Sequence, residues 1–313
     1  MKNSKPLDIQ KHAGCHWFRM TKKERLGLLL FIPSLLGIAL VIFKPLVDSI
    51  IMSLYDIDLL FGGSDAPFVG LENYKWVFTS DWFLPTLGRT VLVSGVVMSI
   101  QVILALIVAL ITDFDFPGKG LVRSMLISPW IIPIVVAGLM WNWMYDPTIG
   151  PINDFLMGIG AIKAPMNWLG QTNTALGAVM VALVWKGLPF VYLTILGAMQ
   201  QVPEDQKEAA RVDGANGFQE FWYITLPGIR EVVTTMIILR TIFLFNHFSF
   251  IHVLTGGGPL GSTEVLAITA VKMGVNSFRY GRASAITTTM FGILLVLFAV
   301  YYSLDQKRRS QAA

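Results

Sequence analysis

The chain has 313 residues, of which 54% are hydrophobic and only 14% charged. Because soluble domains carry about 25% charged residues, this composition excludes a large soluble domain and favours several membrane helices. The formal net charge of +4 does not indicate nucleic-acid binding, since the basic residues gather at the two ends of the chain beside apolar runs. The single cysteine, Cys15, excludes an internal disulfide and a cysteine metal cluster.

Six apolar runs are long enough to cross a bilayer, whose core needs about 20 helical residues. In chain order they are Leu26–Val47, Leu87–Ile111, Leu121–Tyr145, Thr174–Met199, Val232–Leu254 and Ala283–Leu304. The first run is longer than a secretory signal core of about 7–15 residues, and no small-residue cleavage site follows it, so we expect it to be retained. The sequence therefore predicts an all-α membrane protein with one transmembrane domain, 26–304, between a segment 1–25 and a tail 305–313.

The third run contains two prolines four residues apart, Pro129 and Pro133. Proline removes a backbone donor, and membrane helices tolerate it where neighbours satisfy the freed carbonyl. Two interpretations stay open at this point: a local break near a transport pathway, or a kink that only improves packing.

The basic residues also predict the orientation. With both termini inside, most lysines and arginines fall in the inner segments. The positive-inside rule then places both termini in the cytoplasm, together with the polar segment 201–228 between the fourth and fifth runs.

That polar segment predicts two short helices. The sequence Val202-Pro203-Glu204-Asp205 is a helix start, with acidic residues at the positive end of the helix dipole. Gly214 is suited to the left-handed conformation that ends a helix. Asn216 and Gln219 have the spacing of a capping box for a second helix.

The same segment carries a specific motif, Glu208-Ala-Ala-Arg-Val-Asp-Gly214 followed by Ile224-Thr-Leu-Pro227. It resembles the EAA loop of the membrane subunits of bacterial ABC importers, the loop that docks on the ATP-hydrolysing partner. After this resemblance we call the segment 201–228 the coupling loop. Weaker motifs extend the resemblance to the carbohydrate-type (maltose-like) branch, and to the first of its two permeases: Gly70-Leu-Glu-Asn-Tyr74, Val184-Trp-Lys-Gly-Leu-Pro-Phe190, Leu254-Thr-Gly-Gly-Gly-Pro259 and Tyr280-Gly-Arg-Ala-Ser-Ala285.

The resemblance implies the type I ABC importer permease fold, located in the bacterial inner membrane. It implies a second homologous permease, two ATPase subunits that hold ATP and Mg, and an extracytoplasmic solute-binding protein that delivers a sugar or sugar derivative. This chain would bind no cofactor itself. The residues implied to dock on the ATPase are Glu208, Ala209, Ala210 and Gly214, and Asp213 is typical of the branch.

Polar and aromatic residues inside the runs are candidates for the substrate pathway, because burying an ionisable group in a membrane is costly. They are Lys186, Arg240, Asn246, His247, Trp141 and Tyr192. Asn246 and His247 lie near the middle of their run. Structural interpretations compete: Lys186 snorkels or pairs with a partner subunit, and Arg240 clamps the bundle. The sequence does not indicate which sugar is carried, or whether it is neutral or anionic.

No catalytic or metal-binding motif is present: the sequence has neither a P-loop nor a His-Glu-x-x-His. We therefore expect a non-catalytic subunit. The alternatives are a self-contained six-helix secondary transporter, which usually has internal symmetry, and a membrane scaffold that uses the loop for interactions. We detect no such symmetry.

Overall fold

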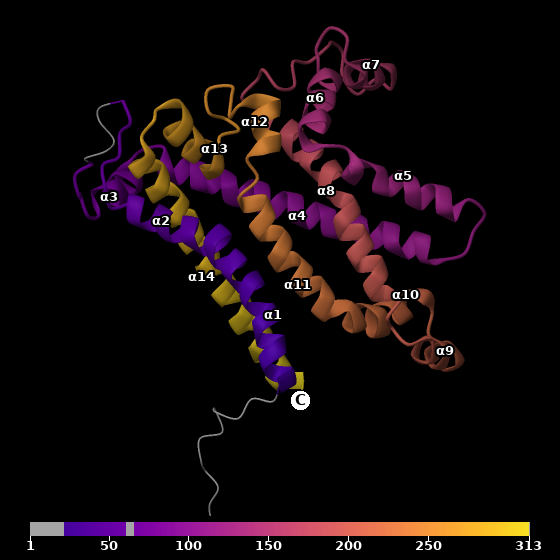
Figure 1. The fold of residues 1–313 in the computed structure, drawn as a ribbon. Coiled ribbons are helices and arrows are strands. Elements are labelled where there is room, and N and C mark those ends of the chain that lie inside the picture. Colours follow the sequence, from indigo (N-terminus) through magenta and orange to yellow (C-terminus); the bar gives the residue numbers. More distant parts are fainter. Residues whose placement is uncertain (1–21, 61–65, 313) are drawn as a thin grey trace, which may run out of the picture. The chain divides into compact units, whose positions relative to one another are not determined.

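Figure 1 shows the computed structural model of the protein, which describes residues 22–60 and 66–312. Most of the predicted segment 1–25, with Cys15, lies outside these residues. Within them the regular structure is helical, apart from isolated antiparallel bridges. The chain separates into two compact units, Met1–Ile51 and Met52–Ala313, so a single domain 26–304 stays a prediction.

The first unit contains the first predicted span. Its helix α1 (Lys22–Ile38) continues through a π-helical turn, η2 (Ala39–Phe43), into α2 (Lys44–Met52). The Lys44 amide bonds back to the Ala39 carbonyl, one residue before Pro45, which has no amide to donate. Residues Leu29–Met52 form 24 residues of apolar helix, long enough to cross a membrane.

Three long helices form the centre of the second unit. They are α4 (Phe83–Asp113), α8 (Ala175–Met199) and α11 (Leu226–Phe245), and each packs against the other two. Buried alanines on both α4 and α8, such as Ala105 and Ala182, let the helices approach closely, as small residues do in membrane proteins.

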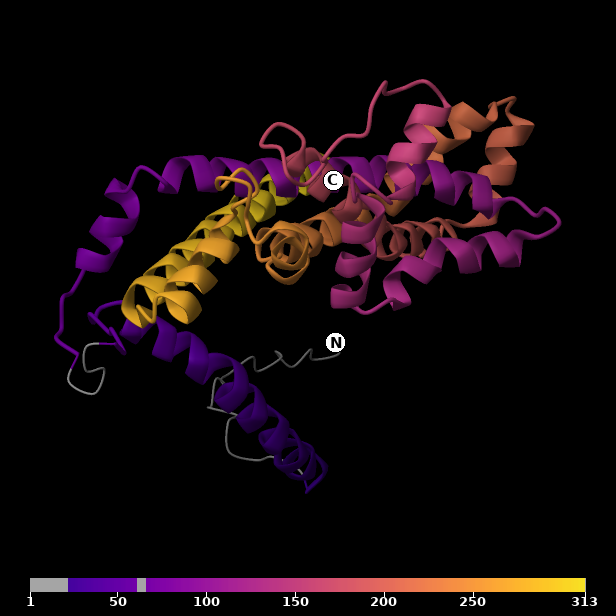
Figure 2. The ribbon, with the colours of Figure 1, turned by 90° about the horizontal axis from the view of Figure 1, so that it is seen from above.

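Two of the predicted spans are broken. The third run is not one straight helix but α5 (Lys119–Ile131) and α6 (Ile134–Met144), which meet at 101°. Both views of the ribbon show this bend (Figures 1 and 2). The chain is broken here, and the position of the break is explained by Pro133, which immediately precedes α6 and donates no backbone hydrogen bond; that the break lies near a transport pathway stays a prediction.

The fifth run divides similarly into α11 and α12 (Ser249–Thr255), bent by 44°. Helix α12 packs against α6, where a Cβ added to Gly138 would lie 2.7 Å from a Val253 methyl. Among the described residues, four helices are long and apolar enough to cross a membrane, or up to six if each bent pair counts as one span.

Outside the coupling loop, the remaining helices are shorter, except the last. They are α3 (Glu72–Thr79), α7 (Pro151–Gly158), α13 (Leu266–Val271) and the π-helix η5 (Lys272–Asn276). The last helix, α14 (Tyr280–Ala312), continues beyond the predicted end of its span at Leu304. The apolar helix Leu266–Asn276 is absent from the predicted elements, because it is too short to span a bilayer.

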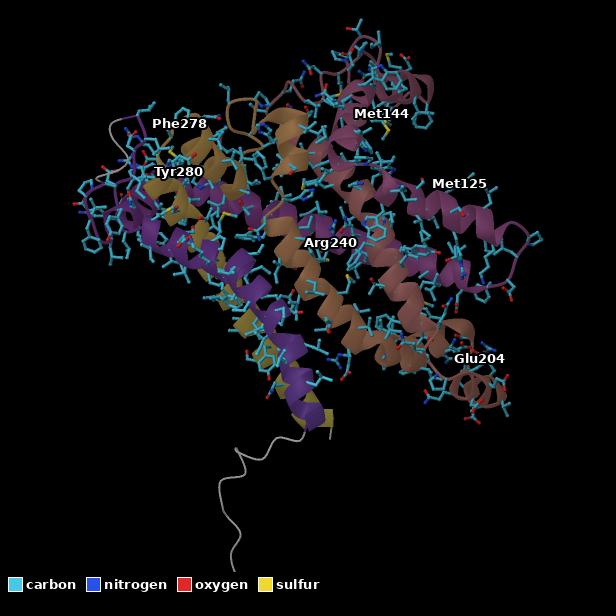
Figure 3. The ribbon with its side chains drawn as sticks, in the orientation of Figure 1. Met125, Met144, Glu204, Arg240, Phe278 and Tyr280 are labelled. Carbon is cyan, nitrogen blue, oxygen red and sulfur yellow. The ribbon has the colours of Figure 1, made fainter. Side chains whose placement is uncertain are left out.

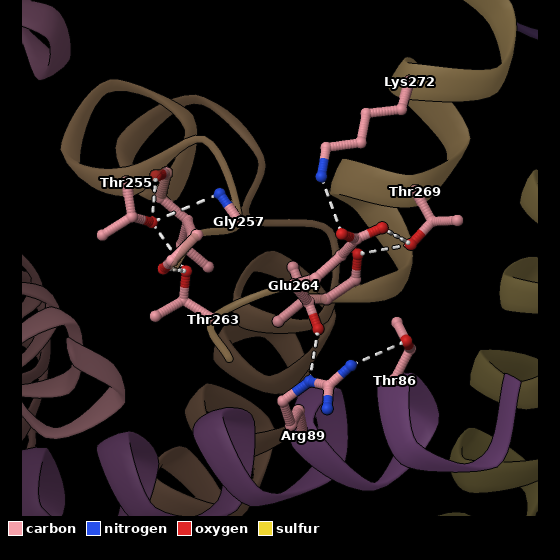
Figure 4. Close-up of polar contacts among 11 residues, drawn as sticks. Thr86, Arg89, Thr255, Gly257, Thr263, Glu264, Thr269 and Lys272 are labelled. Carbon is pink, nitrogen blue, oxygen red and sulfur yellow. Dashed lines mark hydrogen bonds and ion pairs between the residues drawn. The ribbon is translucent and has the colours of Figure 1, made fainter. Parts of the chain in front are cut away.

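A polar cluster holds the loop between α12 and α13 against α4 (Figure 4). The Glu264 carboxylate accepts hydrogen bonds from Lys272 Nζ at 2.7 Å and Thr269 Oγ1 at 2.9 Å. Arg89, on α4, donates to the Glu264 carbonyl at 2.8 Å. This end of the second unit lies opposite the coupling loop, at the other end of α11.

Candidate functional site

The first helix of the coupling loop is α9 (Glu204–Val212). It begins after Pro203, whose ψ of 128° is extended, so the structure confirms the predicted helix start. Glu204 and Asp205 occupy the first turn and Arg211 the last, in accord with the helix dipole. Glu208 and Ala209 are exposed and Ala210 is half-buried.

The end of α9 follows from Gly214, whose φ of +90° is in the left-handed region. The Gly214 amide donates to the Arg211 carbonyl at 3.1 Å, and the Ala215 amide to the Ala210 carbonyl at 2.9 Å. These two bonds form a complete Schellman motif, which glycine at this position favours. Asp213 and Gly214 therefore lie exposed at a fixed turn.

The second helix of the loop, α10 (Gly217–Glu220), has the predicted capping box. The Gln219 amide donates to the Asn216 side chain and the Asn216 amide to the Gln219 side chain, both at 2.9 Å. A π-helical turn, η4 (Phe221–Thr225), leads directly into α11. The two short helices joined at a glycine are confirmed.

An ion-pair network ties these two helices together. Arg211 donates to the two Glu220 carboxylate oxygens at 2.8 and 3.2 Å and to Glu204 at 3.3 Å. Hydrogen bonding to Glu220 and its charge raise the pKa of the Arg211 guanidinium. Lys207, 8% exposed, also pairs with Glu204 at 3.3 Å. Sequence reasoning missed this network, although the i, i+3 spacing of Glu204 and Lys207 was a signal.

Two further features surround the loop. A cavity of 960 Å³ lies between the coupling loop and the ends of α4 and α8, with Asp113, Lys207 and Glu220 in its lining. Large apolar side chains are also exposed on and beside the two helices: Val212, Phe218, Trp222 and Tyr223. The rings of Phe218 and Trp222 stack with centroids 6.0 Å apart.

A buried polar contact joins the three central helices. Arg240 on α11 donates through Nε to the Gln101 side chain on α4 at 3.1 Å, and Gln101 donates to the Leu183 carbonyl on α8 at 2.9 Å. Gly187 provides the space, since a Cβ there would lie 1.7 Å from Arg240 Nη2. Figure 3 places Arg240 in the middle of the bundle, whereas Glu204 lies at its end. Gln101 was missed, although an amide within an apolar run is itself a signal.

Asn246 and His247 lie together at the break between α11 and α12. Asn246 follows the last residue of α11, is exposed, and donates to the Ile242 carbonyl at 3.0 Å. The half-buried His247 ring lies 6.2 Å from that of Phe250. Discontinuous helices are typical of substrate sites in transporters, because their ends leave backbone groups to bind a ligand.

The two aromatic candidates are both buried. Trp141 is 7% exposed and packs edge-on against Trp185, and its indole Nε1 finds no hydrogen-bond acceptor among the described residues. Tyr192 is 1% exposed, and its hydroxyl lies 2.9 Å from Thr112 Oγ1. The structure therefore separates these candidates: Asn246 and His247 adjoin one break, Arg240 joins three helices, and Tyr192 belongs to the core around α8. Their roles toward a substrate stay predictions.

The last candidate, Lys186 on α8, contacts the break between α5 and α6. Its ammonium lies against backbone carbonyls of the α5–α6 bend, at 2.7 Å from Pro129 and 2.5 Å from Ile132.

The sequence and the fold are both similar to those of known transport proteins. The chain is 36% identical to the trehalose/maltose transport system permease protein MalF of Thermococcus litoralis, over 92% of this chain and 96% of the relative. It is 32% identical to the sulfoquinovosyl glycerol transport system permease protein SmoG of Agrobacterium fabrum, over 88% of this chain and 89% of the relative.

Solved structures share the fold. A chain in the crystal structure of a bacterial alginate ABC transporter, in complex with an alginate pentasaccharide-bound periplasmic protein, superposes with a TM-score of 0.79 at 20% identity. The match covers 91% of this chain and 96% of that chain. The family model of binding-protein-dependent transport system inner membrane components matches residues 101–310, more than half of the chain. The chain therefore belongs to that family, as a permease with the fold of type I ABC importers.

Proposed function

We propose that the chain is the first of two non-identical permeases of an ATP-driven importer for a sugar or sugar derivative. A second permease completes the pathway, an extracytoplasmic solute-binding protein delivers the substrate, and two ATPase subunits bind ATP and Mg. Both termini lie in the cytoplasm. Membership of the family and the transport roles named for its relatives support this proposal.

The coupling loop carries the proposal. A loop that transmits movement of the ATPase to the membrane spans must be rigid, exposed and attached to those spans. Helix α9 is closed by the Gly214 turn, tied to α10 by Arg211, and separated from α8 by only a few residues. Its exposed Glu208 offers a carboxylate to a basic group of the ATPase, and Ala209 leaves room for close approach. The exposed Val212 and Phe218 add apolar surface beside it.

The substrate pathway is best supported at the broken helices. The exposed amide of Asn246 and the ring of His247 offer polar groups at the α11–α12 break. The unpartnered Trp141 indole N–H suits a sugar hydroxyl, and its face suits sugar C–H groups. Arg240 stays a candidate contact through the guanidinium nitrogens that do not bond Gln101. Tyr192, with its hydroxyl close to Thr112, is supported less.

The test is to purify the tagged protein from its native membrane in mild detergent, identify the chains that accompany it by mass, and measure ATP hydrolysis and sugar uptake after reconstitution. We expect a second permease with its own EAA loop, an active ATPase, and uptake that requires ATP. A lone chain that transports without ATP would contradict the proposal and favour a secondary transporter. A lone chain without transport would favour a scaffold.

A further inference from the structure

The bend between α5 and α6 leaves backbone carbonyls without their helical partners. In a continuous helix the Pro129 carbonyl would accept from the amide of residue 133, but this residue is proline and has none. Helix α5 ends at Ile131, and Ile132 is extended, with a ψ of 128°. Such orphan carbonyls are costly inside a membrane, where water does not replace the missing donor.

Lys186 supplies the missing donors. Its ammonium, in the middle of α8, lies 2.7 Å from the Pro129 carbonyl, 2.5 Å from that of Ile132 and 3.4 Å from that of Trp130. An ammonium has three N–H groups; the Pro129 and Ile132 carbonyls accept two of them at short distance, and the Trp130 carbonyl is a longer third contact. The positive charge also meets the negative end of the α5 dipole, which offsets part of the cost of placing a half-buried lysine within a span.

We propose that Lys186 is the positioning residue that fixes the α5–α6 bend and ties it to α8, and that it is not a substrate ligand. The inference rests on the proposed function, because it assigns a part of the transport machinery. The backbone carbonyls already accept hydrogen bonds from the Lys186 N–H groups that a sugar or an anion would otherwise bind. Lys186 supplies the N–H donor that Pro133 lacks, so the bend depends on the lysine as well as on the proline.

The position of Lys186 connects the bend to the coupling loop. Helix α8 is helical throughout from Lys186 to Met199, with Pro189 inside it, and Val202 beyond it packs against Gly228 at the start of α11. The next residue on α8 is Gly187. Its lack of a side chain makes room for the hydrogen-bonded pair of Arg240, from α11, and Gln101, from α4. One turn of α8 thus holds α5, α4 and α11, and a displacement of α9 reaches the bend through a single helix.

The test measures the bend directly in the assembled, substrate-free complex in nanodiscs. Spin labels are attached to cysteines that replace Ser124 of α5 and Leu139 of α6, which are both exposed. The native cysteine is removed by Cys15→Ser, and the distance between the labels is measured by pulsed electron paramagnetic resonance. In Lys186→Met, we expect the mean distance to shift by about 5 Å, one helical pitch. Lys186→Arg keeps the donors, and Lys163→Met makes the same change on an exposed loop. Both are expected to match the parent.

Uptake gives the second readout. We expect Lys186→Met to lower the maximal rate about tenfold, the effect of one partly buried charge-assisted hydrogen bond, with the half-saturating sugar concentration unchanged. An unchanged distance in Lys186→Met would overturn the inference, and a raised half-saturating concentration would assign Lys186 to the substrate. If this variant does not fold, Lys186→Gln replaces it. Its shorter side chain reaches fewer carbonyls, so a smaller shift is expected, and no shift overturns the inference.

The two proposals fail separately. If the parent complex takes up no sugar, the proposed importer function is wrong, while the label distances still decide whether Lys186 fixes the bend.

Discussion

At the scale of single residues, Gly187 has the tightest surroundings among the described glycines within α8. A Cβ at this position would lie 1.7 Å from Arg240 Nη2 and 2.3 Å from Gln101 Nε2. Gln101 is fully buried and bonded to the Leu183 carbonyl, so it has little freedom to move aside. The glycine is therefore a requirement of the buried polar contact rather than of helix geometry.

We expect Gly187→Ala to separate Arg240 from Gln101 and to destabilise the protein by about 1–3 kcal/mol, the cost of an unsatisfied buried polar group. Thermal unfolding of the purified protein in detergent measures this. The matched control is Gly197→Ala in the same helix, where an added Cβ meets nothing within 4 Å. The control is expected to be neutral or stabilising, by up to about 1 kcal/mol, from helix propensity. Equal melting temperatures for the two variants would show that the site tolerates a methyl group.

At the scale of elements, the coupling loop acts as one body because Arg211 of α9 pairs with Glu220 of α10. Each short helix alone would be marginal, since helices of this length gain most of their stability from contacts outside themselves. The capping box and the Gly214 turn fix the ends of the helices, and the ion pair fixes one helix against the other.

Reversing the charge in Arg211→Glu should loosen α9, because Glu204 and Glu220 would then repel it. We expect faster amide exchange in α9 and α10, and uptake lowered by about twofold to fivefold, the range of exposed ion pairs. Hydrogen exchange of the reconstituted protein gives the first readout. The exchanged pair, Arg211→Glu with Glu220→Arg, restores the attraction and should recover protection. A double variant no better than the single one would indicate that the pairing is not what orders the loop.

The break between α11 and α12 makes a second prediction at this scale. Asn246→Ala removes the exposed side-chain amide, which donates back to the Ile242 carbonyl of α11 and, among the described residues, to no other helix. We expect the half-saturating sugar concentration to rise about fivefold, the loss of one neutral hydrogen bond, while the complex stays intact. Gln171→Ala, which removes an exposed amide from a loop, is the control. Uptake equal to the parent would move the pathway away from this break.

At the scale of the whole molecule, the described residues place two kinds of polar group at opposite ends of the second unit. Helices α9 and α10 of the coupling loop lie at one end, and α7, α12 and α13 lie toward the other (Figure 1). A membrane protein that links a soluble ATPase on one side to a binding protein on the other requires such a division. The proposal therefore assigns different partners to the two ends.

A charge reversal at each end separates these partners. We expect Glu208→Lys to reduce the ATPase that co-purifies with the protein by about tenfold, because it places like charge against the basic group that a carboxylate would meet. Asp154→Lys makes the same change on α7, where the residue is exposed, and should leave the ATPase bound. Quantitative mass spectrometry of the purified complexes measures both. Equal recovery of ATPase in the two variants would exclude Glu208 from the docking surface.

Local features of the sequence determined much of this protein. Apolar runs of bilayer length located the spans, because a lipid-exposed backbone must satisfy its own hydrogen bonds as helix. Gly214, Asn216 and Gln219 specified the turn and cap of the coupling loop, because these motifs depend only on neighbours a few residues apart. Pro133 located the break in the third run, because it lacks an amide.

Only the tertiary structure decided how the broken ends are satisfied. The 101° angle between α5 and α6 does not follow from Pro133, and the donor that satisfies the bend, Lys186, is 54 residues from Ile132. Arg240 and Gln101 are 139 residues apart in the chain. In the sequence, each is simply a polar residue within an apolar run, and nothing indicates that they are partners. Sequence patterns identify a group that needs a partner, because burial is costly. Which partner it finds depends on how the helices pack, and that is set by contacts between distant parts of the chain.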